Sequence, residues 1–269
     1  MISVEEARAR ILAAFAPLPA ETVGLDAAAG RVLATAAEAR CSQPPVAVSR
    51  MDGYAVRAAD VAAVPASLSV TGEVPAGRPY DGRIEAGQAL RIFTGAPLPD
   101  GADSVVMQED TESDGPTVTV AEAVPKGRHV RPAGLDFRAG DSLIPAGTRL
   151  SSRHVALLAA MNLPWLAVHR RPRVAILSTG DELALPGEAL GPGRIVASNG
   201  PGLAAFVAAL GGDPVHLGIA GDSRDALAEA LAGARGCDLL VTTGGASVGD
   251  YDFVKAAFEE DGPVAFWKV

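Results

Sequence analysis

Two polar, glycine-containing turns in the last third of the sequence consist of residue types that bind anions. Residues 178–182 (STGDE) follow one apolar segment, and residues 242–250 (TTGGASVGD) follow a later one. Small residues let backbone N–H groups and hydroxyls approach a phosphate, and a following helix N-terminus favours negative charge. A Gly-Gly pair can also simply form a tight turn, but two such turns at one sheet edge favour a phosphate-bearing ligand.

Acidic residues accompany both turns. They are Asp181, Glu182, Asp222, Asp250 and Asp252. So many carboxylates would repel a phosphate unless a hard cation such as Mg²⁺ lies between them, and oxygen ligands suit that ion. We therefore consider Asp181, Glu182, Asp222 and Asp250 as candidate metal ligands. In the alternative interpretation, Asp222 and Asp252 cap helices and Glu182 is solvated.

A second group of candidate residues lies in the first half of the chain. Residues 49–55 (SRMDGYA) and 91–96 (RIFTGA) place polar side chains beside glycines, including Asp52 and Thr94. A local basic cluster, Lys126, Arg128 and Arg131, precedes Asp136 and could hold phosphate or a small oxyanion. The same cluster could equally be a solvated turn.

Helix and strand patterns indicate how these residues are positioned. A capping pattern at Ser3 and Glu6 predicts a helix that ends before Pro17, and a second helix is predicted from Gly30 to Ala39. Residues 51–149 have the short apolar runs and glycine-proline turns of an all-β module, and Ser151 or Ser152 caps a further helix that reaches Met161. From Arg173 onward, strands at 174–177, 214–219 and 239–241 alternate with helices at 202–210 and 225–234. This alternation predicts a mostly parallel sheet with helices on both faces and a ligand at the carboxyl ends of its strands.

The predicted fold class is therefore multidomain α/β plus β. We expect a helical linker domain at 1–50 and 146–172, an all-β module at 51–145 and a three-layer α/β/α domain at 173–269. A length of 269 residues and an apolar fraction of 48% are consistent with more than one hydrophobic core.

Composition excludes several functional classes. The net charge of −9 and the aromatic content of 4% disfavour a nucleic-acid partner. Cys41 and Cys237 are too few and too isolated for a disulfide framework or a cysteine zinc site, and the histidines lack metal-binding spacing. The acidic N-terminal residues and the absence of a long apolar run predict no signal peptide and no membrane span, so we expect a cytoplasmic protein.

Four motifs together resemble the molybdopterin molybdenumtransferase family, the bacterial MoeA proteins, which are similar to the E domain of gephyrin. They are residues 49–56 (SRMDGYAV), 94–96 (TGA), 178–183 (STGDEL) and 244–249 (GGASVG), and they occur in the family's order along almost the whole chain. The part from Arg173 onward also resembles the molybdopterin adenylyltransferases, which makes it less specific.

The resemblance implies that adenylylated molybdopterin and molybdate are converted to molybdenum cofactor, with release of AMP, in a Mg²⁺-dependent step. Matching motifs suggest catalytic roles for Asp52, Thr94, Asp136, Glu182, Asp222 and Asp252. They suggest ligand binding by Thr179, Gly180, Asp181, Thr243, Gly244, Gly245, Ser247 and Gly249, with Thr94 and the Lys126, Arg128 and Arg131 cluster contacting anions. The carboxylates would hold Mg²⁺ at the pyrophosphate and position molybdate.

The family also implies a homodimer in which the molybdopterin-binding domain of one subunit meets the β module of the other. This sequence departs from the family in two respects. Arg50 stands where the family usually has a small residue, and the chain ends at Val269, before the family's C-terminal β domain, so we expect a truncated chain. The alternatives are a molybdopterin adenylyltransferase, disfavoured by the modules before Arg173, and a non-catalytic scaffold, disfavoured by Asp52, Asp136 and Glu182.

Overall fold

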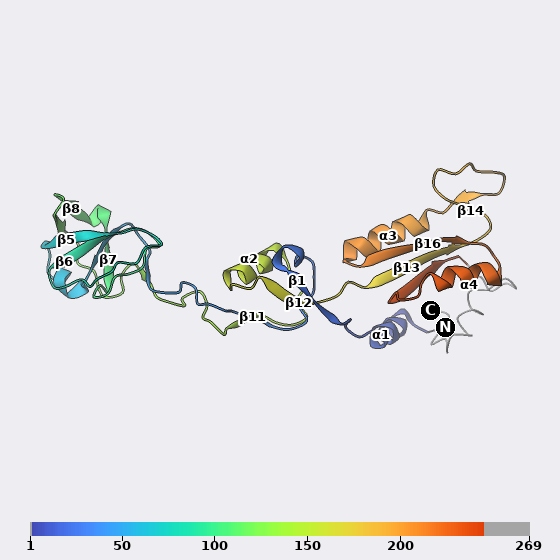
Figure 1. Ribbon diagram of the computed structural model, residues 1–269, viewed down its shortest axis with the longest axis horizontal. Coiled ribbons are helices and arrows are strands. Elements are labelled where there is room, and N and C mark those ends of the chain that lie inside the picture. The colour runs from blue at the N-terminus through green and yellow to red at the C-terminus, as the bar shows by residue number, and fades with distance from the viewer. Residues whose placement is uncertain (1, 245–269) are drawn as a thin grey trace. The chain divides into compact units, whose positions relative to one another are not determined.

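The computed structural model describes residues 2–244, which divide into two compact units. The α/β unit contains residues 2–23, 27–34 and 167–244, and the β unit contains residues 24–26 and 35–166. The boundary falls within two strands that pair with each other, β1 (Ala20–Gly24) and β12 (Trp165–His169) (Figure 1). The predicted all-β stretch 51–145 lies inside the β unit, whereas the predicted boundaries of a separate helical linker domain remain predictions.

The β unit is built around a six-stranded sheet in the order β7-β4-β6-β5-β9-β8. Its strands are β4 (Gly53–Val56), β5 (Ala66–Val74), β6 (Gln88–Ile92), β7 (Ser104–Met107), β8 (Thr111–Ser113) and β9 (Thr117–Val120). Neighbouring strands are antiparallel except β5 and β6, which are parallel. Short 3₁₀ helices lie at η2 (Ala58–Val61) and η3 (Gln108–Asp110).

Both faces of this sheet are covered by apolar side chains. Tyr54 and Val56 belong to one buried cluster, whereas Ala55, between them, belongs to a second cluster with Leu90 and Ile92. Successive side chains of a strand point to opposite faces, so this alternation gives each face its own hydrophobic core. Residues 51–145 thus contain strands and short 3₁₀ helices and no α-helix.

Two small strand pairs extend the β unit. β2 (Ala37–Glu38) pairs with β11 (Ser142–Ile144), and β3 (Val48–Ser49) pairs with β10 (Val130–Arg131), both antiparallel. Both pairs join segments that are far apart in the sequence.

The predicted helix from Gly30 to Ala39 is wrong. Arg31 and Leu33 are buried, as are Ala37 and Ala39, and burial at every second residue is the pattern of extended chain. The backbone is paired accordingly, because Leu33 bridges Val168 and Ala37 lies in β2. The short 3₁₀ helix η1 (Leu25–Ala27) lies just before this stretch.

The other predicted helices are confirmed. α1 (Val4–Ala14) begins after Ser3, whose hydroxyl accepts a hydrogen bond from the Glu6 N–H at 3.1 Å. α2 (Ser152–Ala160) begins after Ser151, whose hydroxyl accepts from the His154 N–H. Such caps satisfy N–H groups that have no partner within the helix.

In the α/β unit, β13 (Arg173–Thr179) lies between β16 (Asp213–Ala220) and β17 (Leu239–Thr243), and both pairings are parallel. Helices α3 (Asn199–Leu210) and α4 (Arg224–Ala232) pack on opposite faces (Figure 1). Val174 and Ile176 face α3, whereas Leu177 faces α4. A small parallel pair, β14 (Leu183–Ala184) and β15 (Ile195–Val196), follows β13.

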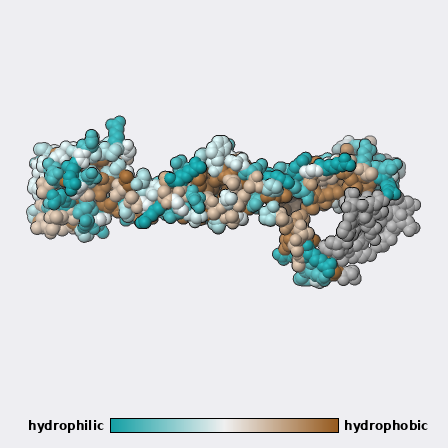
Figure 2. Space-filling view, turned by 60° about the horizontal axis from the view of Figure 1, so that its bottom comes forward, coloured by the Kyte–Doolittle hydropathy of each residue, from teal (hydrophilic) through white to brown (hydrophobic). Residues whose placement is uncertain are grey.

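The surface shown in Figure 2 mixes hydrophilic and hydrophobic residues. Among residues 2–244, no helix is both long and apolar enough to cross a membrane.

Charged side chains link the beginning of β13 to the segment before β17. The Arg170 guanidinium donates to both carboxylate oxygens of Asp238, and the Arg173 N–H donates to Oδ2 at 2.8 Å. The hydrogen bonds from Arg170, followed by that from Arg173, lower the pKa of Asp238 from 3.8 to about 2. A carboxyl group with a depressed folded-state pKa stabilises the fold above its unfolded pKa and loses that contribution as the pH falls.

We therefore expect Asp238→Asn to be less stable than the parent chain at neutral pH, with the difference shrinking as the pH falls from 3.8 towards 2. Chemical denaturation of both proteins across that pH range measures the difference. A difference in unfolding free energy that does not change with pH would show that the ionised Asp238 does not contribute in this way.

Candidate functional site

The two predicted ligand-binding turns meet at the carboxyl edge of the parallel sheet. β13 ends at Thr179 and β17 ends at Thr243. The Thr243 hydroxyl donates to the Ser178 hydroxyl at 3.2 Å, and the Thr179 hydroxyl donates to the Thr243 carbonyl oxygen at 3.4 Å. The side chains of Ser178 and Thr179 are almost fully buried, so these contacts hold the two turns together from inside the sheet.

Glycine is required where the second turn begins. Gly244 has a φ of +88°, and a Cβ atom built on it would lie 2.2 Å from the Thr179 carbonyl oxygen. Gly180, on the first turn, has a φ of +144°, and a Cβ there would lie 2.3 Å from a carboxylate oxygen of Glu182. A side chain at Gly244 would therefore collide with the backbone of β13, whereas at Gly180 the close neighbour is the movable end of Glu182 and the positive φ is what favours glycine.

Carboxylates from two neighbouring strand ends face each other at the same edge. The Asp222 N–H donates to Asp181 Oδ1 at 3.1 Å, and the Asp181 N–H donates to Asp222 Oδ2 at 3.4 Å. Each carboxylate thus accepts from the backbone of the other segment, which aligns the segments after β13 and β16. Both side chains, like that of Glu182, remain exposed to a ligand.

The predicted metal ligands are only partly brought together. Among residues 2–244, no three acidic, histidine or cysteine side chains lie close enough to hold a metal ion. Five predicted site residues, Gly245, Ser247, Gly249, Asp250 and Asp252, lie outside the described residues.

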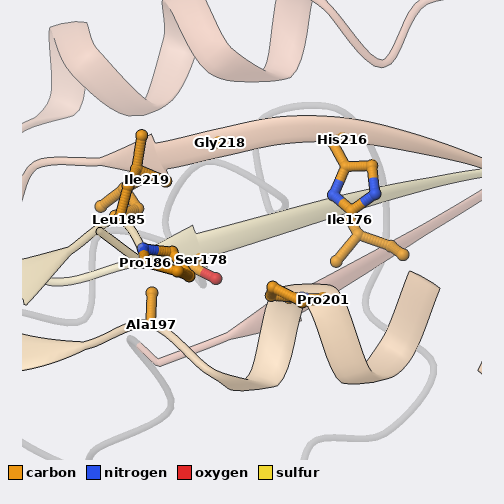
Figure 3. Close-up of a pocket in the computed structure, with 10 residues that line it drawn as sticks. Ile176, Ser178, Leu185, Pro186, Ala197, Pro201, His216, Gly218 and Ile219 are labelled. Carbon is orange, nitrogen blue, oxygen red and sulfur yellow. The ribbon is translucent and has the colours of Figure 1, made fainter. Parts of the chain in front are cut away.

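An apolar cavity of about 120 Å³ lies beside this edge, between β13, β16 and the start of α3 (Figure 3). Ile176, Ser178, Pro201 and His216 contribute to its lining. Its volume is below the range of about 300 to 1,000 Å³ that is usual for small-molecule sites. The sequence patterns did not indicate this cavity, because its lining residues other than Ser178 lie outside the polar motifs.

In the β unit, Asp52 and Thr94 form a second polar site. Asp52 precedes β4, Thr94 follows β6, and the antiparallel register places Gly53 opposite Ile92. The Thr94 N–H and hydroxyl donate to the same oxygen, Asp52 Oδ1, at 2.7 and 2.8 Å. These two hydrogen bonds, with a smaller contribution from the Arg91 charge, lower the pKa of the exposed Asp52 carboxyl group despite some desolvation.

Arg91 belongs to the candidate segment 91–96, but it is not among the predicted site residues. Its guanidinium lies over the rings of Tyr54 and Phe93, 5.1 and 5.3 Å from their centroids, and also donates to Gln108. Cation–π contacts of this kind hold the guanidinium beside Asp52. The sequence signal was weak because Tyr54 and Phe93 are far apart along the chain.

A larger cavity, of about 480 Å³, adjoins this pair in the β unit. Its lining residues are Val48, Ser49, Arg50, Thr94, Gly95, Arg131 and Leu135. One nitrogen of Arg131, Nη2, donates to both carboxylate oxygens of Asp136 at 2.7 Å.

The three residues of the predicted basic cluster do not all line this cavity. Of its three members, the described lining of this cavity includes Arg131 but neither Lys126 nor Arg128. Arg128 instead donates to the ring of His129 at 3.1 Å. Arg50, noted in the sequence as a departure from the family, lines the cavity.

The comparisons with known proteins agree with these features. A family model described as the MoeA N-terminal region (domain I and II) matches residues 2–162, and one described as a probable molybdopterin binding domain matches residues 175–269. The chain is 45% identical over 87% of its length to a molybdopterin molybdenumtransferase of Nostoc, of which it covers 55%. It is 34% identical over its full length to one from Haemophilus influenzae, of which it covers 67%.

A crystal structure of a molybdopterin biosynthesis MoeA protein from Pyrococcus horikoshii is also similar. It is 32% identical, has a TM-score of 0.86, and matches 97% of this chain and 67% of its own. This chain thus spans about half to two thirds of the length of these relatives. Because the MoeA N-terminal model matches more than half of the sequence, and because these relatives agree with it, the chain belongs to the MoeA family.

Proposed function

We propose that this chain binds adenylylated molybdopterin and takes part in its conversion, with molybdate, to molybdenum cofactor and AMP. The observation that carries the proposal is the meeting of the Thr179–Gly180 and Thr243–Gly244 turns beside the Asp181–Asp222 pair. The matched molybdopterin binding domain covers the same segment, and relatives are named molybdopterin molybdenumtransferases.

The geometry of the sheet edge supports a phosphate cradle. Gly180 and Gly244 leave their backbones free of side chains, so that N–H groups of the two turns can approach an anion. We infer that the complete domain has three layers, with the parallel sheet between helices. The ligand then lies where parallel strands end, as is general for such sheets.

The ionised Asp52 supports a catalytic role for the β unit. Thr94 occupies one carboxylate oxygen with two hydrogen bonds, which orients the group and leaves the other oxygen available to a substrate. Such a carboxylate can accept a proton or position a polar group of the substrate. Thr94 then acts chiefly by holding Asp52, because both of its donors are engaged in this way.

Magnesium dependence is also part of the proposal. The Asp181 and Asp222 carboxylates are hard oxygen donors of the kind that Mg²⁺ prefers, and the ion would neutralise charge at a pyrophosphate. Two protein carboxylates suffice only if phosphate oxygens or a residue such as Asp250 complete the ligand set. Magnesium titration with and without the pterin ligand measures this requirement.

We further propose a cytoplasmic homodimer whose sites combine the β unit of one subunit with the α/β unit of the other. The candidate residues divide between these two units, with Asp52, Thr94 and Asp136 in one and Thr179, Glu182 and Asp222 in the other. Exposed apolar side chains on α1, among them Val4 and Leu12, are consistent with an additional contact surface.

The direct test is AMP release from adenylylated molybdopterin by the chain, with molybdate and Mg²⁺ each present or omitted. We expect release that requires both. Release independent of molybdate would contradict molybdenum insertion, and absence of pterin binding would contradict the proposed cradle.

A further inference from the structure

The 480 Å³ cavity of the β unit carries two guanidinium groups on its lining, and its volume falls in the usual range for a ligand site. One group, on Arg131, belongs to the basic cluster seen in the sequence. The other, on Arg50, belongs to a segment 81 residues earlier by number and is not part of that cluster. The reason they share a cavity lies in the strand pairing.

The β3–β10 pair brings the two arginines to one face. Val48 is paired with Arg131, and Ser49 with Val130. The Arg50 N–H donates to the His129 carbonyl oxygen at 2.9 Å, which continues the pairing by one residue. Arg50 directly follows β3 and this hydrogen bond places it opposite His129, two residues before Arg131, so that Arg50 is a diagonal neighbour of Arg131.

The two guanidiniums differ in how their charge is balanced. The Arg131 guanidinium forms an ion pair with Asp136. The Asp52 carboxylate instead accepts two hydrogen bonds from Thr94. Within the described part of the chain, the Arg50 guanidinium has no hydrogen bond or ion pair. Its positive charge therefore has no carboxylate partner at the cavity, although the chain as a whole is acidic.

A neighbouring group responds to this positive charge. Desolvation lowers the pKa of His129, and the charges of Arg128 and Arg50 lower it further, against smaller opposing contributions from Asp110 and Glu122. Arg50 and Arg131 on the cavity lining both bring positive charge that would attract an anion.

We propose that Arg50, together with the free edge of Arg131, binds a tetrahedral oxyanion in this cavity. A guanidinium offers two parallel donors that match adjacent oxygens of such an anion. Backbone at Gly95 leaves that side of the cavity without a side chain. The identity of the anion, either molybdate or the phosphate of the pterin ligand, rests on the proposed function. Anion binding in the cavity does not depend on that function.

The experiment is calorimetric titration of the full chain with sodium molybdate and, separately, with sodium phosphate at low ionic strength. We expect Arg50→Gln to weaken binding by about ten- to a hundredfold, as for loss of a hydrogen bond to a charged group. Arg78→Gln is the matched control, because Arg78 is an exposed arginine of the same unit outside the cavity, and it should bind as the parent does. Circular dichroism would establish that both variants remain folded.

Unchanged anion affinity in Arg50→Gln would overturn the proposal, as would failure of the parent chain to bind either anion at millimolar concentration. A clear preference for molybdate assigns the site to the metal oxyanion, and equal or tighter phosphate binding assigns it to the pterin phosphate. If the chain releases no AMP but still binds anions in an Arg50-dependent way, the proposed reaction is contradicted and the proposed oxyanion site is supported.

Discussion

Gly244→Ala is expected to lower the free energy of unfolding by about 2 to 5 kcal/mol, the sum of left-handed backbone strain and overpacking. The added methyl carbon would lie 2.2 Å from the Thr179 carbonyl oxygen and 2.8 Å from its hydroxyl oxygen. The turn must therefore move away from β13. This movement breaks the hydroxyl contacts that join the two strand ends, so we also expect binding of molybdopterin to be lost.

Gly187→Ala provides the matched control in the same unit. Gly187 also has a positive φ, +94°, but a Cβ there meets nothing within 4 Å. Gly187→Ala should lower the free energy of unfolding only by the backbone strain, about 1 to 2 kcal/mol, and should leave molybdopterin binding intact. Chemical denaturation and titration with molybdopterin measure both effects. If the two alanine variants behave alike, the close approach of Gly244 to Thr179 is not what holds the cradle.

Asp52→Asn is expected to reduce molybdate-dependent AMP release by about a hundredfold or more, the usual scale for a positioned acid–base group. The asparagine oxygen can still accept both hydrogen bonds from Thr94, so the fold should be retained while the negative charge is lost. Thr94→Ala should have a smaller effect, because it removes one of the two donors and lets the pKa of Asp52 rise towards its ordinary value.

The control for Asp52→Asn is Asp81→Asn, which removes an exposed carboxylate of the same unit outside both sites. AMP release and thermal unfolding should be measured for each variant. Full activity in folded Asp52→Asn would remove Asp52 from the catalytic residues.

Mixing subunits makes the same variant a test of the shared site. If Asp52 and Glu182 act across a subunit boundary, a dimer of one Asp52→Asn and one Glu182→Gln chain has one intact site and one doubly altered site. Random mixing would then restore about a quarter of the parent activity. No restoration, with mixed dimers demonstrated, would place both residues of each site in one chain.

Much of the α/β unit could be predicted from local patterns. Continuous apolar runs alternating with helical segments indicated buried parallel strands, and parallel strands present their carboxyl ends at one edge. That rule was enough to bring residues 178–182 and 242–244 together before any coordinates were known, as the Thr243 to Ser178 hydrogen bond confirms. The all-β character of residues 51–149 followed equally from turn residues and short apolar runs.

Residues 30–39 show where local patterns failed. Their apolar residues are compatible with a helix, and only partners distant in sequence, such as Val168 for Leu33, decide that the chain is extended there. Pairing in small strand pairs depends on register, which local propensity does not encode.

The sequence by itself determined the chemistry that is available, because glycines, hydroxyls and carboxylates in fixed order are the groups that bind a phosphate-bearing ligand. It also determined the family, through motifs spread along the chain. Only the tertiary structure decided which charges meet: Thr94 reaches Asp52 through the β4–β6 register, and Arg50 rather than Lys126 or Arg128 joins Arg131 through β3 and β10. The physical reason is that electrostatic interactions depend on distances in space, and those distances are set by strand pairing between remote segments.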